Sequence, residues 1–276
     1  MTAAVLLGAC GSSGSEGDSA APATTEAQDV TTSLPATTAS STQPTTTTTA
    51  PTTTTTTTST TTTTTAPPRP EDLVEPAGPL QSGSEGRRTL ALQEALKAQA
   101  YDPGEPDGQF GLKTTMAVWA WQALHGQPKD GVVSPQLEAM ILAKPAQPML
   151  RPGMGPTHTE VDLTRQVILV WKDGRLALVS HVSTGSQVPY CENGHCGNAV
   201  TPVGTYDYYR RVDGWRNGPL GKLYNPVYFV GGIAVHGAPS VPNRPASHGC
   251  VRIPMHIAEY FPTLVAKGDP VETFRS

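Results

Sequence analysis

Near its C-terminal end the chain places one cysteine close to two histidines. His236 precedes a short loop, and Ser247, His248 and Gly249 come directly before Cys250. A cysteine attacks a carbonyl carbon as the thiolate, and a neighbouring imidazole favours that form by lowering the thiol pKa through an ion pair. Either histidine can serve Cys250 in this way. Backbone amides beside Gly249 can donate to a developing oxyanion. These residue types therefore predict acyl transfer.

The same residues are compatible with other roles. Cys250 can form half of a disulfide if the chain is exported, because exported chains with four cysteines commonly pair them. His236 can be a purely structural histidine at the end of a strand. A zinc site can be built from Cys191, His195 and Cys196 with one of the later histidines, although this spacing lacks a second matching pair. The clustering in one glycine-punctuated segment favours the catalytic interpretation.

Strands are expected to position these side chains. Residues two apart on a strand project to the same side, so His248 and Cys250 can share one face. The C-terminal half is rich in β-forming residues, with a hairpin-type turn at residues 172–174. The β-rich runs are residues 167–171, 176–182, 205–210 and 227–235. One helix fits residues 255–267, although Pro262 should kink or interrupt it.

The segment from His236 to Arg252 resembles the signature of the L,D-transpeptidase catalytic domain, the YkuD family. The resemblance covers residues 155–276 and implies a β-sandwich with one helix. Further segments that match in the same order are Val161-Asp162-Leu163, Gln166 to Val170, Ser183-Thr184-Gly185, Thr201-Pro202-Val203-Gly204 and Gly268-Asp269-Pro270-Val271.

The resemblance implies a role for each residue of the segment. Cys250 is the nucleophile, His236 the general base and acid, and His248 a supporting or alternative partner. Arg252 helps to hold the site or the substrate, although a local ion pair with a carboxylate of the fold is an equally good interpretation. Ser247 and Gly249 are expected to border the substrate, and no metal or cofactor is required.

The reaction implied by the resemblance has two steps. The nucleophile attacks the amide after the third residue of a peptidoglycan stem tetrapeptide, releases D-alanine and forms a thioester. An amine of a neighbouring stem then resolves the thioester and links two third-position residues. With water as the acceptor the protein is an L,D-carboxypeptidase, and with an inactive site it is a non-catalytic peptidoglycan-binding lipoprotein. The resemblance also implies acylation by carbapenem-type β-lactams.

A second compact unit is expected at residues 83–144. Leu92 and Leu96 give one helix an apolar stripe, and a second stripe includes Trp121. A third helix can begin with Ser134 as its N-cap, followed by Pro135. This unit resembles the three-helix peptidoglycan-binding domain and is expected to bind glycan. The matching residues are Leu92-Gln93, Leu96, Tyr101-Asp102, Asp107 to Gly111, Thr114, Ala117-Val118 and Trp121-Gln122, with Trp121 where phenylalanine is usual and Ala100 where glycine often stands.

The N-terminal part of the chain cannot form a core. Residues 11–82 are small and polar and include a threonine tract, so we expect a disordered tether that is open to O-glycosylation. Residues 1–10 resemble a lipobox in which Cys10 becomes the lipidated N-terminus. The stretch before Cys10 is shorter than a secretory signal requires, so we expect the natural start to lie upstream.

Cysteine use and charge complete the expected setting. If Cys10 carries lipid and Cys250 is the nucleophile, Cys191 and Cys196 remain, and the loop between them can close a small disulfide. The formal net charge of −4 offers no broad basic surface for nucleic acid. The sequence therefore predicts an exported protein, lipid-anchored at the outer face of the cytoplasmic membrane or in the cell wall.

Overall fold

The computed structural model describes residues 78–276. The predicted lipobox at Cys10 and most of the predicted tether therefore lie outside the described residues. None of the helices between residues 78 and 276 combines the length and the apolar character that a membrane span requires.

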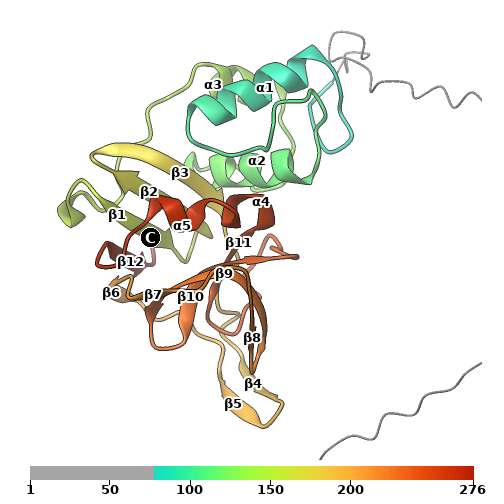
Figure 1. Ribbon diagram of the computed structural model, residues 1–276. Coiled ribbons are helices and arrows are strands. Elements are labelled where there is room, and N and C mark those ends of the chain that lie inside the picture. Colours follow the sequence, from blue (N-terminus) through green and yellow to red (C-terminus); the bar gives the residue numbers. More distant parts are fainter. Residues whose placement is uncertain (1–77) are drawn as a thin grey trace, which may run out of the picture. The chain divides into compact units, whose positions relative to one another are not determined.

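Three short helices form the N-terminal bundle of the described chain, as predicted (Figure 1). Leu92, Leu96 and Trp121, which belong to the two expected apolar stripes, are fully buried. The third helix begins at the predicted cap, where the Ser134 hydroxyl accepts a hydrogen bond from the Leu137 amide at 3.2 Å. The helices are α1 (Arg87–Ala98), α2 (Leu112–Leu124) and α3 (Pro135–Leu142).

The bundle begins earlier than the sequence indicated. Leu80, placed in the tether by its composition, is fully buried and exchanges backbone hydrogen bonds with Val133 at 2.9 and 2.8 Å. A single apolar residue without periodic neighbours carries no helix or strand signal, which explains the error. Ala100 adopts a left-handed φ of 66°, which accounts for glycine being usual at this position in the resembled family.

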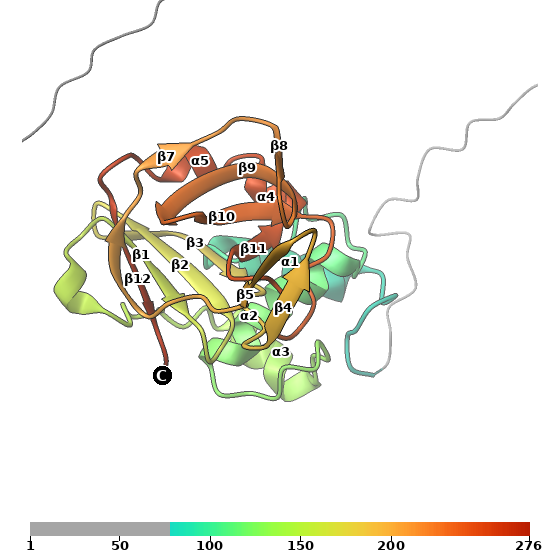
Figure 2. The same cartoon turned by 90° about the horizontal axis from the view of Figure 1, so that it is seen from below.

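Two sheets pack against each other and form the predicted β-sandwich (Figure 2). The first has the strand order β3-β2-β1-β12-β6, and the second has the order β11-β10-β9-β7 with β8 paired to β9. The strands of the first sheet are β1 (His158–Asp162), β2 (Val167–Lys172), β3 (Arg175–His181), β6 (Gly204–Asp207) and β12 (Pro270–Phe274). Those of the second are β7 (Arg210–Arg211), β8 (Trp215–Gly218), β9 (Gly221–Val230), β10 (Ile233–Ala238) and β11 (Val251–Pro254).

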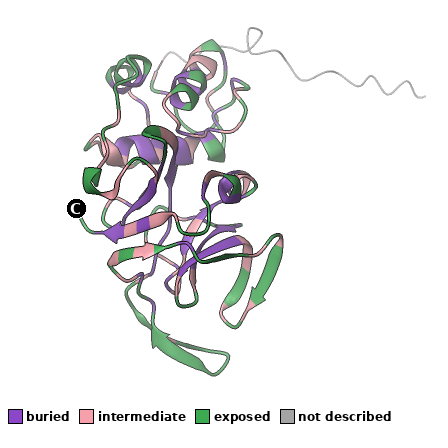
Figure 3. Cartoon of the chain, turned by 60° about the vertical axis from the view of Figure 1, so that its left-hand side comes forward, coloured by how far each residue is buried: buried purple, intermediate pink, exposed green. Residues whose placement is uncertain are grey.

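The predicted hairpin is present as β2 and β3, but two longer runs are divided. Residues 227–235 contain a turn at Gly231, with a φ of 52°, that separates β9 from β10. Residues 205–210 are shared between β6 and β7. A separate hairpin of β4 (Pro189–Glu192) and β5 (His195–Asn198) is mostly exposed (Figure 3).

The helix predicted for residues 255–267 is interrupted, as Pro262 indicated, and it also ends earlier than predicted. Two four-residue helices occupy its place, α4 (Met255–Ala258) and α5 (Phe261–Leu264). In a continuous helix the ring of Pro262 would clash with the carbonyl of Ala258, and Pro262 has no N–H to donate. The Ala258 carbonyl instead accepts a hydrogen bond from the Asn225 side chain at 3.0 Å.

Strand β2 of the first sheet is buried on both faces. On β2, Ile168 and Val170 point into the sandwich core, whereas Val167, Leu169 and Trp171 belong to a second core shared with the helical bundle. Every residue of β2 except its last is therefore buried. The helical bundle and the sandwich are joined by this common core.

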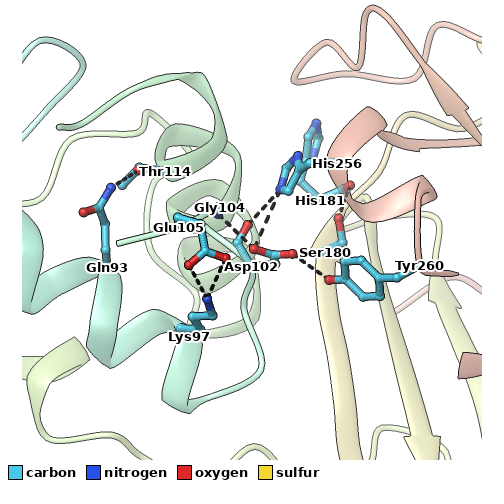
Figure 4. A network of polar contacts seen from close by, with 10 residues as sticks. All are labelled: Gln93, Lys97, Asp102, Gly104, Glu105, Thr114, Ser180, His181, His256 and Tyr260. Carbon is cyan, nitrogen blue, oxygen red and sulfur yellow. Dashed lines mark hydrogen bonds and ion pairs between the residues drawn. The ribbon is translucent and has the colours of Figure 1, made fainter. Parts of the chain in front are cut away.

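Polar contacts also join the bundle to the C-terminal helices. Asp102 follows α1, and its carboxylate accepts a hydrogen bond from the Tyr260 hydroxyl at 2.7 Å (Figure 4). His256 of α4 donates through Nε2 to the Asp102 carbonyl at 3.2 Å. Because α4 packs on β10 and β11, these contacts connect the bundle to the strands described next.

The connection between the bundle and β1 contains a short 3-10 helix, η2 (Pro152–Met154), and is held by a buried carboxylate. Glu160 accepts hydrogen bonds from the amides of Leu150 and Arg151 at 3.2 and 2.6 Å. His158 Nε2 and Trp171 Nε1 donate to it at 3.1 and 3.2 Å. Four donors therefore compensate the cost of burying this charge.

Candidate active site

Two parallel strands bring the predicted catalytic residues together. In the register of β10 and β11, His236 lies opposite Arg252, and Cys250 directly precedes β11. Because side chains alternate along a strand, Cys250 and Arg252 project to the same side. Together with His236 and His248 they line one cavity of about 660 Å³. The pairing of β10 with β11 thus brings His236, which is distant in sequence, to the same cavity as Cys250.

The orientation of His236 leaves one ring nitrogen available as a base. Nδ1 lies 2.9 Å from the Gly237 carbonyl, which can only accept, so Nδ1 carries the hydrogen and Nε2 keeps its lone pair. Burial lowers the pKa of His236 to about 4, and the charge of Arg252 acts in the same direction. The imidazole is therefore neutral at pH 7 and can accept a proton.

The Cys250 thiol is protonated at rest. Burial raises its pKa, and this effect outweighs the opposing backbone hydrogen bond from Ala234 and the charge of Arg252. The sequence had indicated a thiolate stabilised by an imidazolium. Burial disfavours both charged forms, so the structure holds a neutral thiol and a neutral imidazole in the lining of one cavity instead. This arrangement suits proton transfer during attack rather than a preformed ion pair.

His248 faces the exposed β4–β5 hairpin. Its Nε2 lies 3.2 Å from Oε1 of Glu192, and its ring packs edge-on against Tyr190 with 4.7 Å between centroids. Cys191 and Cys196 are cross-strand neighbours in this hairpin and form the predicted disulfide. The zinc alternative needed both of these thiols and is therefore not supported. Cys250 is a free thiol, which also removes the disulfide alternative for it.

The loop before Cys250 is held by internal hydrogen bonds. Ser247 was expected to border the substrate, and it does line the cavity, but its hydroxyl donates to the Cys250 carbonyl at 2.5 Å and accepts from the Gly249 amide at 3.0 Å. The Gly249 amide is thus occupied, so it is not available as one of the oxyanion donors that the sequence predicted beside Gly249. Gly249 has a φ of 138°, and a Cβ there would lie 2.9 Å from the Val200 carbonyl.

Residues with no role assigned from the sequence anchor this loop. Thr201 donates to the Gly249 carbonyl at 2.6 Å and accepts from the Gly185 amide at 2.9 Å. The Thr184 carbonyl accepts from the Ser247 amide at 2.9 Å. A Cβ on Gly185 would lie 2.4 Å from a backbone oxygen, so only glycine fits. In the sequence, these residues were noticed only because the Ser183-Thr184-Gly185 and Thr201-Pro202 motifs occur in the order of the resembled family. Their role in holding the loop before Cys250 becomes clear only from the contacts.

Arg252 faces the cavity and is half-buried. Within residues 78–276 it forms no ion pair with a carboxylate, which contradicts the local-pairing interpretation of this residue. Other positive side chains line the same cavity from the second sheet, namely Arg210, Arg216 and Lys222.

Known proteins share both parts of the described chain. The L,D-transpeptidase catalytic domain model, YkuD, matches residues 156–273, and the peptidoglycan binding domain model matches residues 85–141. The crystal structure of an L,D-transpeptidase from Xylanimonas cellulosilytica is 35% identical, with 73% of this chain and 100% of that chain covered and a TM-score of 0.67. An L,D-transpeptidase structure from Stackebrandtia nassauensis is 22% identical, with 76% and 97% covered and a TM-score of 0.39. No curated protein sequence matches the chain.

Proposed function

Because the chain belongs to the L,D-transpeptidase family, we propose that it cross-links peptidoglycan stem peptides through a thioester on Cys250. The observation that carries this proposal is the pairing of β10 with β11, which places a free thiol and a neutral imidazole in the wall of one cavity. A cavity of about 660 Å³ is in the size range of a small peptide ligand.

In the first step, Nε2 of His236 accepts the thiol proton as Sγ of Cys250 attacks the carbonyl carbon after the third residue of a stem tetrapeptide. The resulting imidazolium then donates this proton to the nitrogen of the departing D-alanine, the C–N bond breaks, and a thioester remains. The neutral resting pair supports this sequence, because the base is unprotonated and the acid forms only during the reaction.

In the second step, an amine of a neighbouring stem attacks the thioester carbon. His236 accepts a proton from this amine and returns it to the departing sulfur, so a new amide links two third-position residues. The same side chain, His236, therefore accepts and returns the proton in both steps. Water as the acceptor gives the free tripeptide instead, which is the carboxypeptidase outcome.

His248 is proposed as a supporting residue rather than the base. Its Nε2 is occupied by Glu192, whereas Nε2 of His236 is the free nitrogen of a fixed tautomer. Arg252, which lies opposite His236 on the neighbouring strand and lines the cavity, is proposed to face the substrate because it has no carboxylate partner in the described chain.

The helical bundle is proposed to hold the enzyme on peptidoglycan outside the cytoplasmic membrane, with Cys10 as a lipid anchor. The match to a peptidoglycan binding domain supports the first part. The common core shared by bundle and sandwich implies that a glycan bound by the bundle stays at a fixed orientation to the cavity.

The test is intact-mass analysis with a carbapenem and with purified stem tetrapeptides. The proposal expects an adduct on the wild-type protein, none on Cys250→Ala, and a cross-linked dimer when acceptor stems are added. An adduct followed only by free tripeptide would identify a carboxypeptidase. Absence of both an adduct and a product from the folded wild-type protein would refute the enzymatic proposal and leave a peptidoglycan-binding protein.

A further inference from the structure

One wall of the catalytic cavity is positively charged. We call Arg210, Arg216 and Lys222 the cationic wall; they come from β7, from β8 and from the start of β9. The two residues that turn β8 into β9 also line the cavity. The wall is therefore built on paired strands of one sheet and lines the same cavity as the loop that carries the nucleophile.

Nothing in the described chain neutralises this wall. None of the described residues that line the cavity is aspartate or glutamate. Arg210 lies over the ring of Tyr228, 4.1 Å from its centroid, a contact that orients the guanidinium but leaves its charge uncompensated. Neither Arg216 nor Lys222 takes part in an ion pair within residues 78–276.

The acidic group that contacts a residue of the cavity lining is already engaged. Glu192 lies on the β4–β5 hairpin, and its carboxylate is 3.2 Å from Nε2 of His248. It does not line the cavity. With Arg252 beside the nucleophile, four positive side chains face one concave space. Charges of one sign that line a cleft focus the field and favour an anionic ligand.

We propose that the cationic wall binds a free carboxylate on the side chain of the donor's third residue, so that the enzyme selects stem peptides in which this carboxylate is not amidated. The proposal rests on the proposed function, because it assigns a substrate feature to the same cavity. An amide at this position is neutral and cannot form the charge-assisted, bidentate pair that arginine forms with a carboxylate.

The chemistry of the donor favours this assignment. The scissile carbonyl must lie at Cys250, and the side chain of a diamino-dicarboxylic third residue carries its second carboxylate several bonds away from that carbonyl. Such a group needs a cationic partner inside the cavity but away from the nucleophile. The wall lines the cavity from β7, β8 and β9, whereas Arg252 lies on β11, two positions from Cys250.

The experiment compares two synthetic stem tetrapeptides that differ only in a carboxylate or a carboxamide on the third side chain. Acylation of the full chain is followed by time-resolved intact mass, and binding is measured by calorimetry with Cys250→Ala. We expect the acid form to be preferred about tenfold or more in both measurements. The combined Arg216→Gln and Lys222→Gln variant should reduce this preference to within about twofold, mainly through KM.

Arg211→Gln is the matched control. Arg211 is the next residue after Arg210 on β7, but its guanidinium donates to the Pro262 carbonyl and does not line the cavity. The control removes one positive charge from the same strand and should keep the preference. Raising the salt concentration to 0.5 M should reduce the preference in the wild type, because the wall is exposed to solvent.

Equal acylation and equal binding of the two peptides, or a preference for the amide, would overturn the inference while the thioester mechanism remains. A preference that survives in the double variant would also overturn it. Preferential binding of the acid by Cys250→Ala, without acylation of the wild type, would instead overturn the proposed function and keep the carboxylate site.

Discussion

Replacing His236 by glutamine tests the neutral resting pair most directly. Glutamine keeps an N–H that can reach the Gly237 carbonyl, so the change removes the basic Nε2 with little change of shape. In the wild type, the base is unprotonated above a pKa of about 4. The acylation rate should therefore rise with pH through about 4 and stay level from about pH 5 to 8.

The variant must instead rely on thiolate that forms without a base. A thiol with an ordinary pKa of about 8.5 is about 3% ionised at pH 7, and burial raises the pKa of Cys250 further. Acylation at pH 7 should thus fall by at least about 30-fold, and by roughly two to four orders of magnitude when the lost proton transfer to the leaving group is included. Its rate should increase about tenfold per pH unit up to at least pH 8.

The assay is single-turnover acylation by a carbapenem and by a stem tetrapeptide, read as the acyl-enzyme mass. His248→Gln is the control, with an expected loss of at most about tenfold and an unchanged pH profile. A His236 variant that acylates at a near-normal rate with a level profile would transfer the base to His248. A wild-type rate that falls tenfold per unit below pH 7 would refute the lowered pKa of His236.

Three further changes test other parts of the structure. His181 is buried, and burial followed by the charge of Lys129 lowers its pKa to about 3. The unfolded state therefore binds more protons at this residue below pH 6.5, so the contribution of His181 lowers the free energy of unfolding by about 3 kcal/mol between pH 6.5 and pH 4.5. In urea unfolding, His181→Gln should remove this part of the slope and leave the part that comes from the lowered pKa of His236. Gly185→Ala should lower the free energy of unfolding by about 2 to 3 kcal/mol and slow acylation, because the new Cβ would overlap with backbone atoms. Gly153→Ala is the control: its Cβ would contact no other atom, so thermal unfolding should be unchanged. Replacing Cys191 and Cys196 by serine should slow acylation, because it loosens the β4–β5 hairpin that contacts His248. The free energy of unfolding should fall by at most about 2 kcal/mol. Equal acylation rates with and without reductant would contradict this prediction.

Local patterns in the sequence were sufficient for most secondary structure. The alternation around the turn at residues 172–174 predicted β2 and β3, and the Ser134 cap predicted the start of α3. They failed where a tertiary contact decided the outcome. Pro262 already indicated a break in the helix expected at residues 255–267, but the partner of the freed Ala258 carbonyl, Asn225, is distant in sequence and could not be read from the local pattern.

For the candidate site too, the sequence predicted one part and tertiary contacts decided the other. The types and spacing of Cys250, His236 and His248 were sufficient to indicate a thiol acyl transfer, because that chemistry depends on which groups the chain contains. Spacing alone did not identify the base, and it did not show that the Gly249 amide is engaged by the Ser247 hydroxyl. The tautomer of His236 and the engagement of His248 by Glu192 depend on partners from other strands.

By itself, the sequence determined the reactive groups, the two-part organisation of the described chain and most of its elements, since these follow from residue chemistry and local periodicity. Only the tertiary structure decided how the groups are charged and what surrounds them. Burial sets the protonation of Cys250 and His236, and no local pattern reports burial. The apolar run of β2 is buried on both faces only because the bundle covers the outer one. The cationic wall exists because three consecutive strands pair in one sheet and bring their charges to one cavity.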